Sequence, residues 1–370
     1  MTKTLTCAVV AAALLGGCAA PVPLTQDPRA PVPSRTLRLE GVRGTRAGVG
    51  VPGRFDHFAY DSATGRLFVA ALENGSLEVI DLNSWTRVRS ITGLKQPQGA
   101  AVVPSTGCVA VACGGDGMLR VYDTRTLEEK TAIEVGPDAD NVRYDVRLHT
   151  VYVTWGAGDR AAIGVYDAAT WRKLREIPFT SRPESFQIDP AGSRLFANVP
   201  GGVRATRDGQ VVVVDRDTNR PTTAIFLEKT ARNFPMAYDA ARDRLFVAAR
   251  RPARLIALDS RRCVVTARAV CGEDSDDLFF DAKTGQVLVI CGGYRPDMAD
   301  GQPAPADADE TGSIEVFTVS TEGKLLRCAL TRTAPHARTG LFIPERRALY
   351  IAVPQRPDAD PEIREYKVPG

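Results

Sequence analysis

The segments Arg66-Leu-Phe-Val-Ala-Ala71 and Leu77-Glu-Val-Ile-Asp81 carry the pattern that decides the fold. Both are short runs of apolar and β-branched residues, and an Asn-Gly turn at 74–75 separates them. Runs of this length on either side of a tight turn predict two antiparallel strands. An apolar strand ending at Asp61 precedes the pair and a more polar strand at 87–91 follows it, so one unit contains four strands.

This unit recurs along the chain with a period of roughly 42–50 residues. The third strand ends in the same way at Asp81, Asp123, Asp167, Asp215 and Asp259. Two further units lack the Asp, at residues 314–319 and 363–368, and complete a set of seven. A small sheet with two apolar faces is stable only between neighbours. The repeat therefore predicts an all-β, seven-bladed β-propeller of four-stranded antiparallel blades.

Closure of the ring can also be predicted. The seventh unit stops after its third strand, whereas the segment Thr36-Leu-Arg-Leu-Glu-Gly-Val42 stands before the first unit. This segment is similar to the fourth strands of other units, such as residues 173–177. We therefore expect a strand at about 36–42 to pair as the outer strand of the last blade.

The repeats resemble those of a known group of proteins. The unit quoted above, and the unit with Thr150-Val-Tyr-Val-Thr154 and Ile163-Gly-Val-Tyr-Asp167, are similar to the YVTN-type repeats of YncE-like bacterial β-propellers. The resemblance covers about residues 36–370 and implies the propeller fold. It implies no particular activity, because such repeats occur in binding modules and in enzymes.

The N-terminal sequence predicts localisation to the cell envelope. Residues 1–17 contain Lys3 and an apolar stretch at 5–15, which fits an export signal and is too short to span a bilayer. The sequence Leu15-Gly-Gly-Cys18 resembles the bacterial lipobox, which implies lipidation of Cys18. Ala19 after it implies an outer-membrane anchor facing the periplasm. The alternative is an ordinary signal peptide that happens to contain a cysteine.

Residues 18–35 hold five prolines and predict an extended tether after the lipidated cysteine, with the propeller at 36–370. In the whole chain of 370 residues, 47 Lys and Arg nearly balance 44 Asp and Glu. We therefore expect no nucleic-acid partner, since such proteins usually carry a strong basic excess. The sequence has no apolar run long enough for a spanning helix.

Two faces of the propeller differ in their loops. The turns between first and second strands, such as 61–65 and 281–285, are short and rich in Asp and Gly, so we interpret them as structural. The loops on the opposite face vary in length, with insertions at 199–208, 292–310 and 354–361. Because propellers usually bind ligands beside variable loops, we expect the functional site on this loop-rich face.

Polar residues gather where the inner strands begin. Aligning these strands on their last residue predicts a ring of side chains at the channel mouth, which switches to apolar and aromatic residues further along each strand. We predict ligand binding by His57, Gln98, Asp140, Asn141, Glu184, Asp276, Asp277, His336 and Arg338. The alternative is that strand ends meet water and are polar for that reason alone.

The ring offers ligands for a divalent cation such as calcium, because calcium takes carboxylate and amide oxygens. No compact ligand spacing accompanies them, so no cofactor is predicted. Catalysis by His57 would need a carboxylate partner. Asp277, aligned with His57, is a better candidate than Asp56, because adjacent side chains on a strand point to opposite faces. We assign no catalytic residue.

Six cysteines remain after removal of the signal and lipidation of Cys18, and export permits disulfides. Cys271 and Cys291 are expected toward the same face of one unit and form the first candidate pair. The alternative is buried free thiols that pack as small apolar groups.

These features predict an envelope-anchored propeller lipoprotein that binds a protein or small-molecule ligand, or serves as a scaffold, through its loop-rich face. The second hypothesis is a metal-assisted hydrolase or lactonase with its site at the channel mouth. Gluconolactonase-type propellers resemble this chain in having acidic and amide groups around a channel, but they have six blades and this chain has seven. The sequence predicts no oligomeric state.

Overall fold

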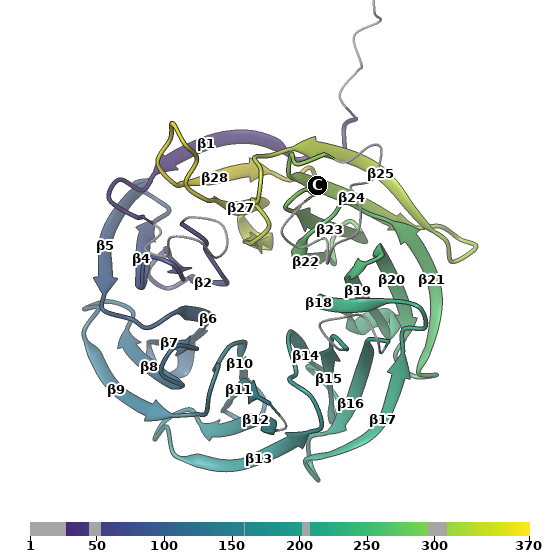
Figure 1. Cartoon of the computed structure of the whole chain (residues 1–370), viewed down its shortest axis with the longest axis horizontal. Helices are drawn as coiled ribbons and strands as arrows, with labels where there is room; N and C mark the ends of the chain where they lie inside the picture. The colour runs from purple at the N-terminus through teal and green to yellow at the C-terminus, as the bar shows by residue number, and fades with distance from the viewer. Residues whose placement is uncertain (1–26, 44–52, 159, 202–207, 295–308) are drawn as a thin grey trace, which may run out of the picture.

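The computed structural model describes residues 27–43, 53–158, 160–201, 208–294 and 309–370. Within them the chain forms seven four-stranded antiparallel sheets arranged in a ring (Figure 1). The predicted signal peptide, Cys18 and the first half of the predicted tether, up to residue 26, lie outside the described residues. In the described part of the chain, no helix has the length and apolarity that a membrane crossing requires.

The first three blades follow the sequence in order, each from its inner to its outer strand. Blade one contains β2 (Phe58–Asp61), β3 (Arg66–Ala71), β4 (Ser76–Asp81) and β5 (Thr86–Thr92). Blade two contains β6 (Pro97–Val103), β7 (Cys108–Cys113), β8 (Met118–Asp123) and β9 (Glu129–Glu134). Blade three contains β10 (Val142–Asp145), β11 (Thr150–Ala157), β12 (Arg160–Asp167) and β13 (Lys173–Phe179).

The next three blades repeat this arrangement. Blade four contains β14 (Phe186–Ile188), β15 (Arg194–Val199), β16 (Gln210–Asp215) and β17 (Arg220–Phe226). Blade five contains β18 (Ala231–Asp239), β19 (Arg244–Arg251), β20 (Ala253–Asp259) and β21 (Val264–Val270). Blade six contains β22 (Ser275–Asp281), β23 (Gln286–Cys291), β24 (Ser313–Val319) and β25 (Leu325–Arg332). The seven-bladed, all-β prediction is confirmed.

Blade seven joins the two ends of the propeller. It contains β26 (Gly340–Ile343), β27 (Ala348–Val353), β28 (Glu362–Lys367) and, as its outer strand, β1 (Val32–Arg38). The predicted closure is therefore confirmed, but the expected bounds of 36–42 are wrong. The strand starts earlier than expected because a proline, which cannot donate a hydrogen bond, is tolerated in an edge strand. The pairing register shifts at a β-bulge between Pro33 and Arg35.

Residues 27–35, which the sequence places in the tether, pack against the propeller. Ala30 is 3% exposed and packs in the core between blades six and seven. The hydroxyl of Thr331 donates a hydrogen bond of 2.7 Å to the carbonyl of Pro31. The described residues from Asp27 onward thus belong to the folded body.

The core of the protein is divided among the blade interfaces. Each of seven apolar clusters draws its buried residues from two neighbouring blades. Between blades one and two, for example, Phe68 and Val79 pack with Val111. Between blades seven and one, Tyr350 packs with Val69. Every blade is buried on both faces only because the ring is closed.

The six described cysteines are free thiols, so the predicted disulfide between Cys271 and Cys291 is wrong for this structure. The two residues do lie together, buried in the core cluster between blades five and six. Burial and the neighbouring thiol of Cys271 raise the pKa of Cys291 well above its ordinary value. The pair behaves as the alternative interpretation expected, as small apolar groups in a packed interface.

Candidate functional site

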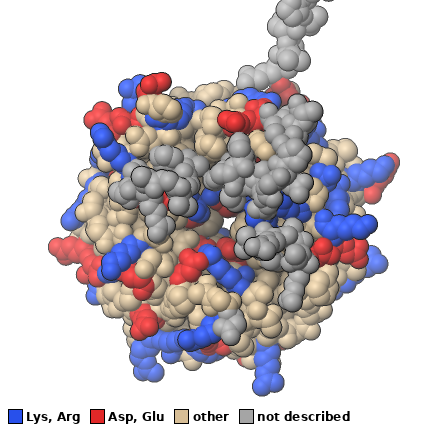
Figure 2. Space-filling model, viewed as in Figure 1, with Lys and Arg blue, Asp and Glu red and all other residues tan. Residues whose placement is uncertain are grey.

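The predicted ring residues lie at equivalent positions of successive blades, just before or at the start of each inner strand. The backbone N–H groups of Asp56, Asp140 and Glu184 each donate a 2.9 Å hydrogen bond to the second strand of their own blade. Equivalent positions therefore reach equivalent places near the axis. On the face shown in Figure 2, acidic and basic side chains lie next to each other around the centre.

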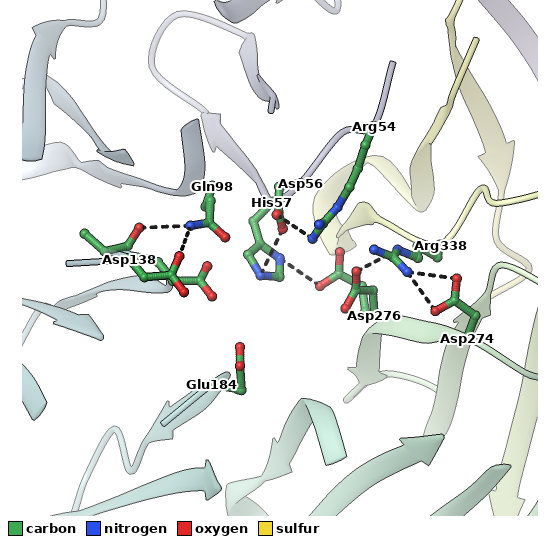
Figure 3. Close-up of polar contacts among 12 residues, drawn as sticks. Arg54, Asp56, His57, Gln98, Asp138, Glu184, Asp274, Asp276 and Arg338 are labelled. Carbon is green, nitrogen blue, oxygen red and sulfur yellow. Dashed lines mark hydrogen bonds and ion pairs between the residues drawn. The ribbon is translucent and has the colours of Figure 1, made fainter. Parts of the chain in front are cut away.

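His57 lies at the middle of this arrangement (Figure 3). Its Nδ1 is 3.3 Å from Oδ1 of Asp277, which confirms the predicted partner. Its Nε2 is 3.6 Å from Oδ1 of Asp56, so the expectation that the adjacent Asp56 points elsewhere is wrong. Burial alone would lower the pKa of His57. The two carboxylates outweigh burial and raise this pKa to about 10, so the imidazole is protonated at neutral pH.

One charged cluster spans blades two, three and four. Arg182 contacts Asp138 at 2.5 Å, Asp140 at 2.7 Å and Glu184 at 3.6 Å. Gln98 donates from Nε2 to Oδ1 of Asp138 at 2.9 Å. Gln98, Asp140 and Glu184 are thus brought together as predicted, and Arg182 is the cation that holds them.

Two carboxyl groups near His57 are protonated more readily than usual. Burial, which Arg182 opposes and Asp140 reinforces, raises the pKa of Glu184 to about 8. Burial likewise raises the pKa of Asp56 to about 6, against the effects of Arg54 and His57. At neutral pH Glu184 therefore carries a proton, and crowding of negative charge is relieved.

A second charged cluster lies between blades five, six and seven. Arg338 makes two contacts with Asp274, at 2.7 and 2.8 Å, and places Nε 2.9 Å from Asp276. Arg250 contacts the same two carboxylates at 3.1 and 2.6 Å. Burial would raise the pKa of Asp276, but Arg338 and Arg250 hold it well below its ordinary range.

Arg250 is a site residue that sequence reasoning missed. It lies near the end of β19, a second strand, whereas the prediction considered first strands only. Its side chain is 8% exposed, and Nε donates 2.8 Å to the carbonyl of Ser275 in the next blade. The available signal was the Arg250-Arg251 pair, which interrupts the apolar pattern found at the equivalent strand ends.

Two predicted residues are not shown to join the charged network. Asn141 is 2% exposed, and within the described residues its Oδ1 accepts no hydrogen bond. His336 lies in the turn before β26, where its backbone N–H donates to the carbonyl of Gly292 at 2.7 Å.

Three of the ring residues lie close enough together to hold a metal ion, provided that His57 gives up its proton to bind it. Asp56, His57 and Asp140 each offer one ligand atom, and these atoms lie within 4.8 Å of one another. Oδ1 of Asp140 is buried and accepts no hydrogen bond from any described residue. A cation with one nitrogen and two oxygen ligands fits this set better than calcium, which prefers oxygen alone.

A cavity of about 640 Å³ continues along the axis from the charged ring. His57, Ser185 and Asp277 form its inner end. Pro104 and Glu345, on the short-turn side, line its other end. The described cavity therefore extends toward the face whose turns we interpreted as structural, away from the loop-rich face.

Seven of the side chains that line the cavity are Phe or Tyr. Its ring-bearing lining residues are Phe58, Tyr60, Tyr144, Tyr238, Phe279, Phe280 and Phe342. In five of the seven inner strands the residue before the last is aromatic, and these five residues, Tyr60, Tyr144, Tyr238, Phe280 and Phe342, line the cavity. Volume and lining are typical of a small-molecule site.

The protonation states predict how stability depends on pH. Folded Glu184 keeps its proton to about pH 8, whereas the unfolded group releases it near 4.5, so stability falls as pH rises between these values. Each such proton changes stability by about 1.4 kcal/mol per pH unit. We expect Glu184→Gln to flatten the decline of the unfolding midpoint between pH 5 and 8.

The exposed Glu322→Gln serves as the matched control and should leave the profile unchanged. Both variants keep His57, whose raised pKa adds stability that is complete below about pH 6.5 and is lost toward pH 10. The decline above pH 8 should therefore survive in both. An identical slope for Glu184→Gln and wild type below pH 8 would show that Glu184 is ionised in the folded protein.

Comparisons with known proteins give the fold. No family model matches the sequence, and no curated protein matches it. A chain of hydrazine synthase from Kuenenia stuttgartiensis is similar with a TM-score of 0.67 and 16% identity, over 87% of this chain and 99% of that one. A chain of the mitotic checkpoint complex is similar with a TM-score of 0.69 and 12% identity, over 100% and 99%. These neighbours support the seven-bladed β-propeller.

Proposed function

We propose that this protein is a YncE-like, lipid-anchored β-propeller of the cell envelope that binds a small molecule on the axis of its ring. One observation carries the binding proposal: the charged ring and the 640 Å³ cavity meet at the same residues, His57, Ser185 and Asp277. Charged groups can fix a ligand's orientation while the aromatic wall supplies contact area. Because the ring of blades is closed, the charged residues and the cavity hold fixed positions relative to each other.

The proposed anchor rests on the lipobox-like sequence that ends at Cys18. In a bacterial host grown with labelled palmitate, the wild-type protein should carry the label and fractionate with the outer membrane. Cys18→Ala should lose the label and the membrane association. Label that persists in Cys18→Ala would contradict lipidation at this residue.

The binding proposal is tested by native mass spectrometry of protein purified from its own envelope. Ala101 lines the cavity, so Ala101→Phe fills part of it. We expect a non-protein mass on the wild type that is absent from Ala101→Phe. Val88→Phe, on an exposed strand position, is the control and should keep the adduct. An adduct that survives Ala101→Phe would place binding elsewhere.

The Asp56–His57–Asp140 set favours a second candidate, a metal-assisted hydrolase or lactonase. A bound cation would supply a Lewis acid and lower the pKa of a bound water. Elemental analysis of the purified protein separates the candidates. A stoichiometric ion that is lost in Asp140→Asn would favour the enzyme, whereas a metal-free wild type that still carries an adduct would favour the binding module.

A further inference from the structure

Arg143 is a cation on the cavity wall without a matching anion. It lies in β10, and its Nη1 donates 2.9 Å to the carbonyl of Val142. Its guanidinium carbon lies 5.7 Å from the ring centre of Phe186. Among the described residues, no Asp or Glu oxygen lies within 4.0 Å of its nitrogens. The Arg143 guanidinium is half-buried and no carboxylate contacts it directly, so an anion that pairs with it in the cavity would be stabilised.

The carboxylates nearest to Arg143 already have partners of their own. Asp277 faces His57 through Oδ1, and its Oδ2 accepts the backbone N–H of Gly340 at 2.9 Å. Asp140 is held by Arg182 at 2.7 Å. Glu345 lies at the exposed rim of the cavity. Of the basic side chains that line the cavity, Arg143 is therefore the one without a carboxylate contact among the described residues.

The three tyrosines of the wall present rings to the cavity rather than free hydroxyls. The hydroxyl of Tyr60 accepts from Arg346 at 3.1 Å. Tyr144 shares hydrogen bonds with Ser105 at 2.9 Å and with His149 at 3.0 Å. The hydroxyl of Tyr238 contacts Arg194 and Asp243 at 3.2 and 3.4 Å. With these hydroxyls in hydrogen bonds, the tyrosine rings supply apolar contact area to a ligand.

We infer that the axial cavity binds a small organic carboxylate, with its carboxylate on Arg143 and its apolar body against the aromatic wall. This inference rests on the proposed function and specifies the ligand class. A guanidinium pairs with a carboxylate through two parallel hydrogen bonds. A single guanidinium matches a single carboxylate, and the Phe and Tyr side chains of the wall favour an anion with an apolar body over a small, strongly hydrated one such as phosphate. The volume suits a ligand with a body as large as a phenylalkyl group.

The test is calorimetric titration of the purified wild type with three probes. We expect 4-phenylbutyrate to bind, 4-phenylbutanamide to bind at least about tenfold more weakly, and inorganic phosphate not to bind. The amide keeps the shape and loses the charge, so it isolates the ion pair. Equal affinity for acid and amide, or binding of phosphate alone, would overturn the inference.

Variants of Arg143 test whether this residue binds the carboxylate of the probe. Arg143→Gln should weaken 4-phenylbutyrate at least about tenfold and leave the amide unchanged. Arg147→Gln, an exposed arginine in the turn of the same blade, is the matched control and should bind as the wild type does. Because Arg143→Gln removes an uncompensated cation, its unfolding midpoint without ligand should equal or exceed that of the wild type. If Arg143→Gln does not fold, Arg143→Lys keeps the charge and should bind more weakly through loss of the paired geometry.

The two levels of the proposal fail in different ways. If no carboxylate binds the wild type, the ligand class is wrong, yet an envelope adduct that is lost in Ala101→Phe would still support axial binding. If the acid binds and neither Arg143 variant weakens it, the cavity is a site but Arg143 does not select the charge. If both the adduct and the probe survive Ala101→Phe, the axial site itself is wrong.

Discussion

A chain that begins at Leu39 should unfold at a temperature at least about 10 °C below that of the full protein, with a broader transition. Removing residues 1–38 takes away β1, the only strand that links the N-terminal part of the described body to β28. It also strips partners from Glu365, which is fully buried and accepts from Ser34 and Arg35, both at 2.5 Å. Glu365 keeps Lys367 and the hydroxyl of Tyr350, both at 2.9 Å, so the truncation costs part of the about 3–5 kcal/mol that a fully unpaired buried charge would cost.

The matched control is a chain that begins at Asp27. It lacks residues 1–26 but keeps β1 and the buried Ala30, so its melting curve should coincide with that of the full protein. A second variant, Arg35→Ala in the full chain, should show an intermediate loss. Equal midpoints for the chains beginning at Asp27 and Leu39, measured by calorimetry, would mean that the ring does not depend on its N-terminal strand.

Arg216→Ala should lower the free energy of unfolding by about 3–5 kcal/mol, although Arg216 is far from the charged ring. Its side chain is fully buried after β16 and ties blade four to Asp145 of blade three. It also donates to the carbonyls of Asp189, at 2.7 Å, and Gly192. Without it, Oδ2 of Asp145 loses its cation and the carbonyls of Asp189 and Gly192 lose this donor, while Oδ1 of Asp145 keeps two backbone donors. Urea denaturation measures the loss.

Two further variants serve as controls for Arg216→Ala. Lys324→Ala breaks an ion pair whose side chains are 72% and 71% exposed, so it should change stability by no more than about 1 kcal/mol. The double variant Asp145→Asn with Arg216→Met removes both charges and should recover part of the loss, since paired apolar replacement of a buried ion pair is often tolerated. Similar losses for Arg216→Ala and Lys324→Ala would show that the buried tie contributes little.

The strands were predictable because their signals are local. The Asp that ends a third strand also builds the turn that follows it: Oδ1 of Asp81 accepts the backbone N–H groups of Asn83 and Ser84 at 2.7 and 3.0 Å. Asp123 repeats this geometry with Arg125 and Thr126. Because the Asp side chain stabilises the turn that follows it, Asp recurs at the same position in successive blades. Alignment on it therefore gives blade number and register together.

The ring of charges was predictable only where first strands supply it. Alignment placed His57 level with Asp277, and the two side chains do meet. Arg250 comes from the end of a second strand and contacts Asp276 in the next blade. The spacing of these two residues in the sequence gives no sign that they meet. The cavity depends on the bulk and direction of many side chains at once, so its extension toward the short-turn side could not be read from turn lengths.

The central claim is that ligands bind on the axis, where the charged ring meets the cavity. A crystal structure of the chain beginning at Asp27, soaked in 4-phenylbutyrate, tests it most directly. We predict density inside the ring of blades, with the carboxylate about 3 Å from the Arg143 guanidinium and the phenyl group against Tyr60, Tyr144 or Tyr238. Ordered water throughout this cavity, with the probe bound on the outer strands, would contradict the claim.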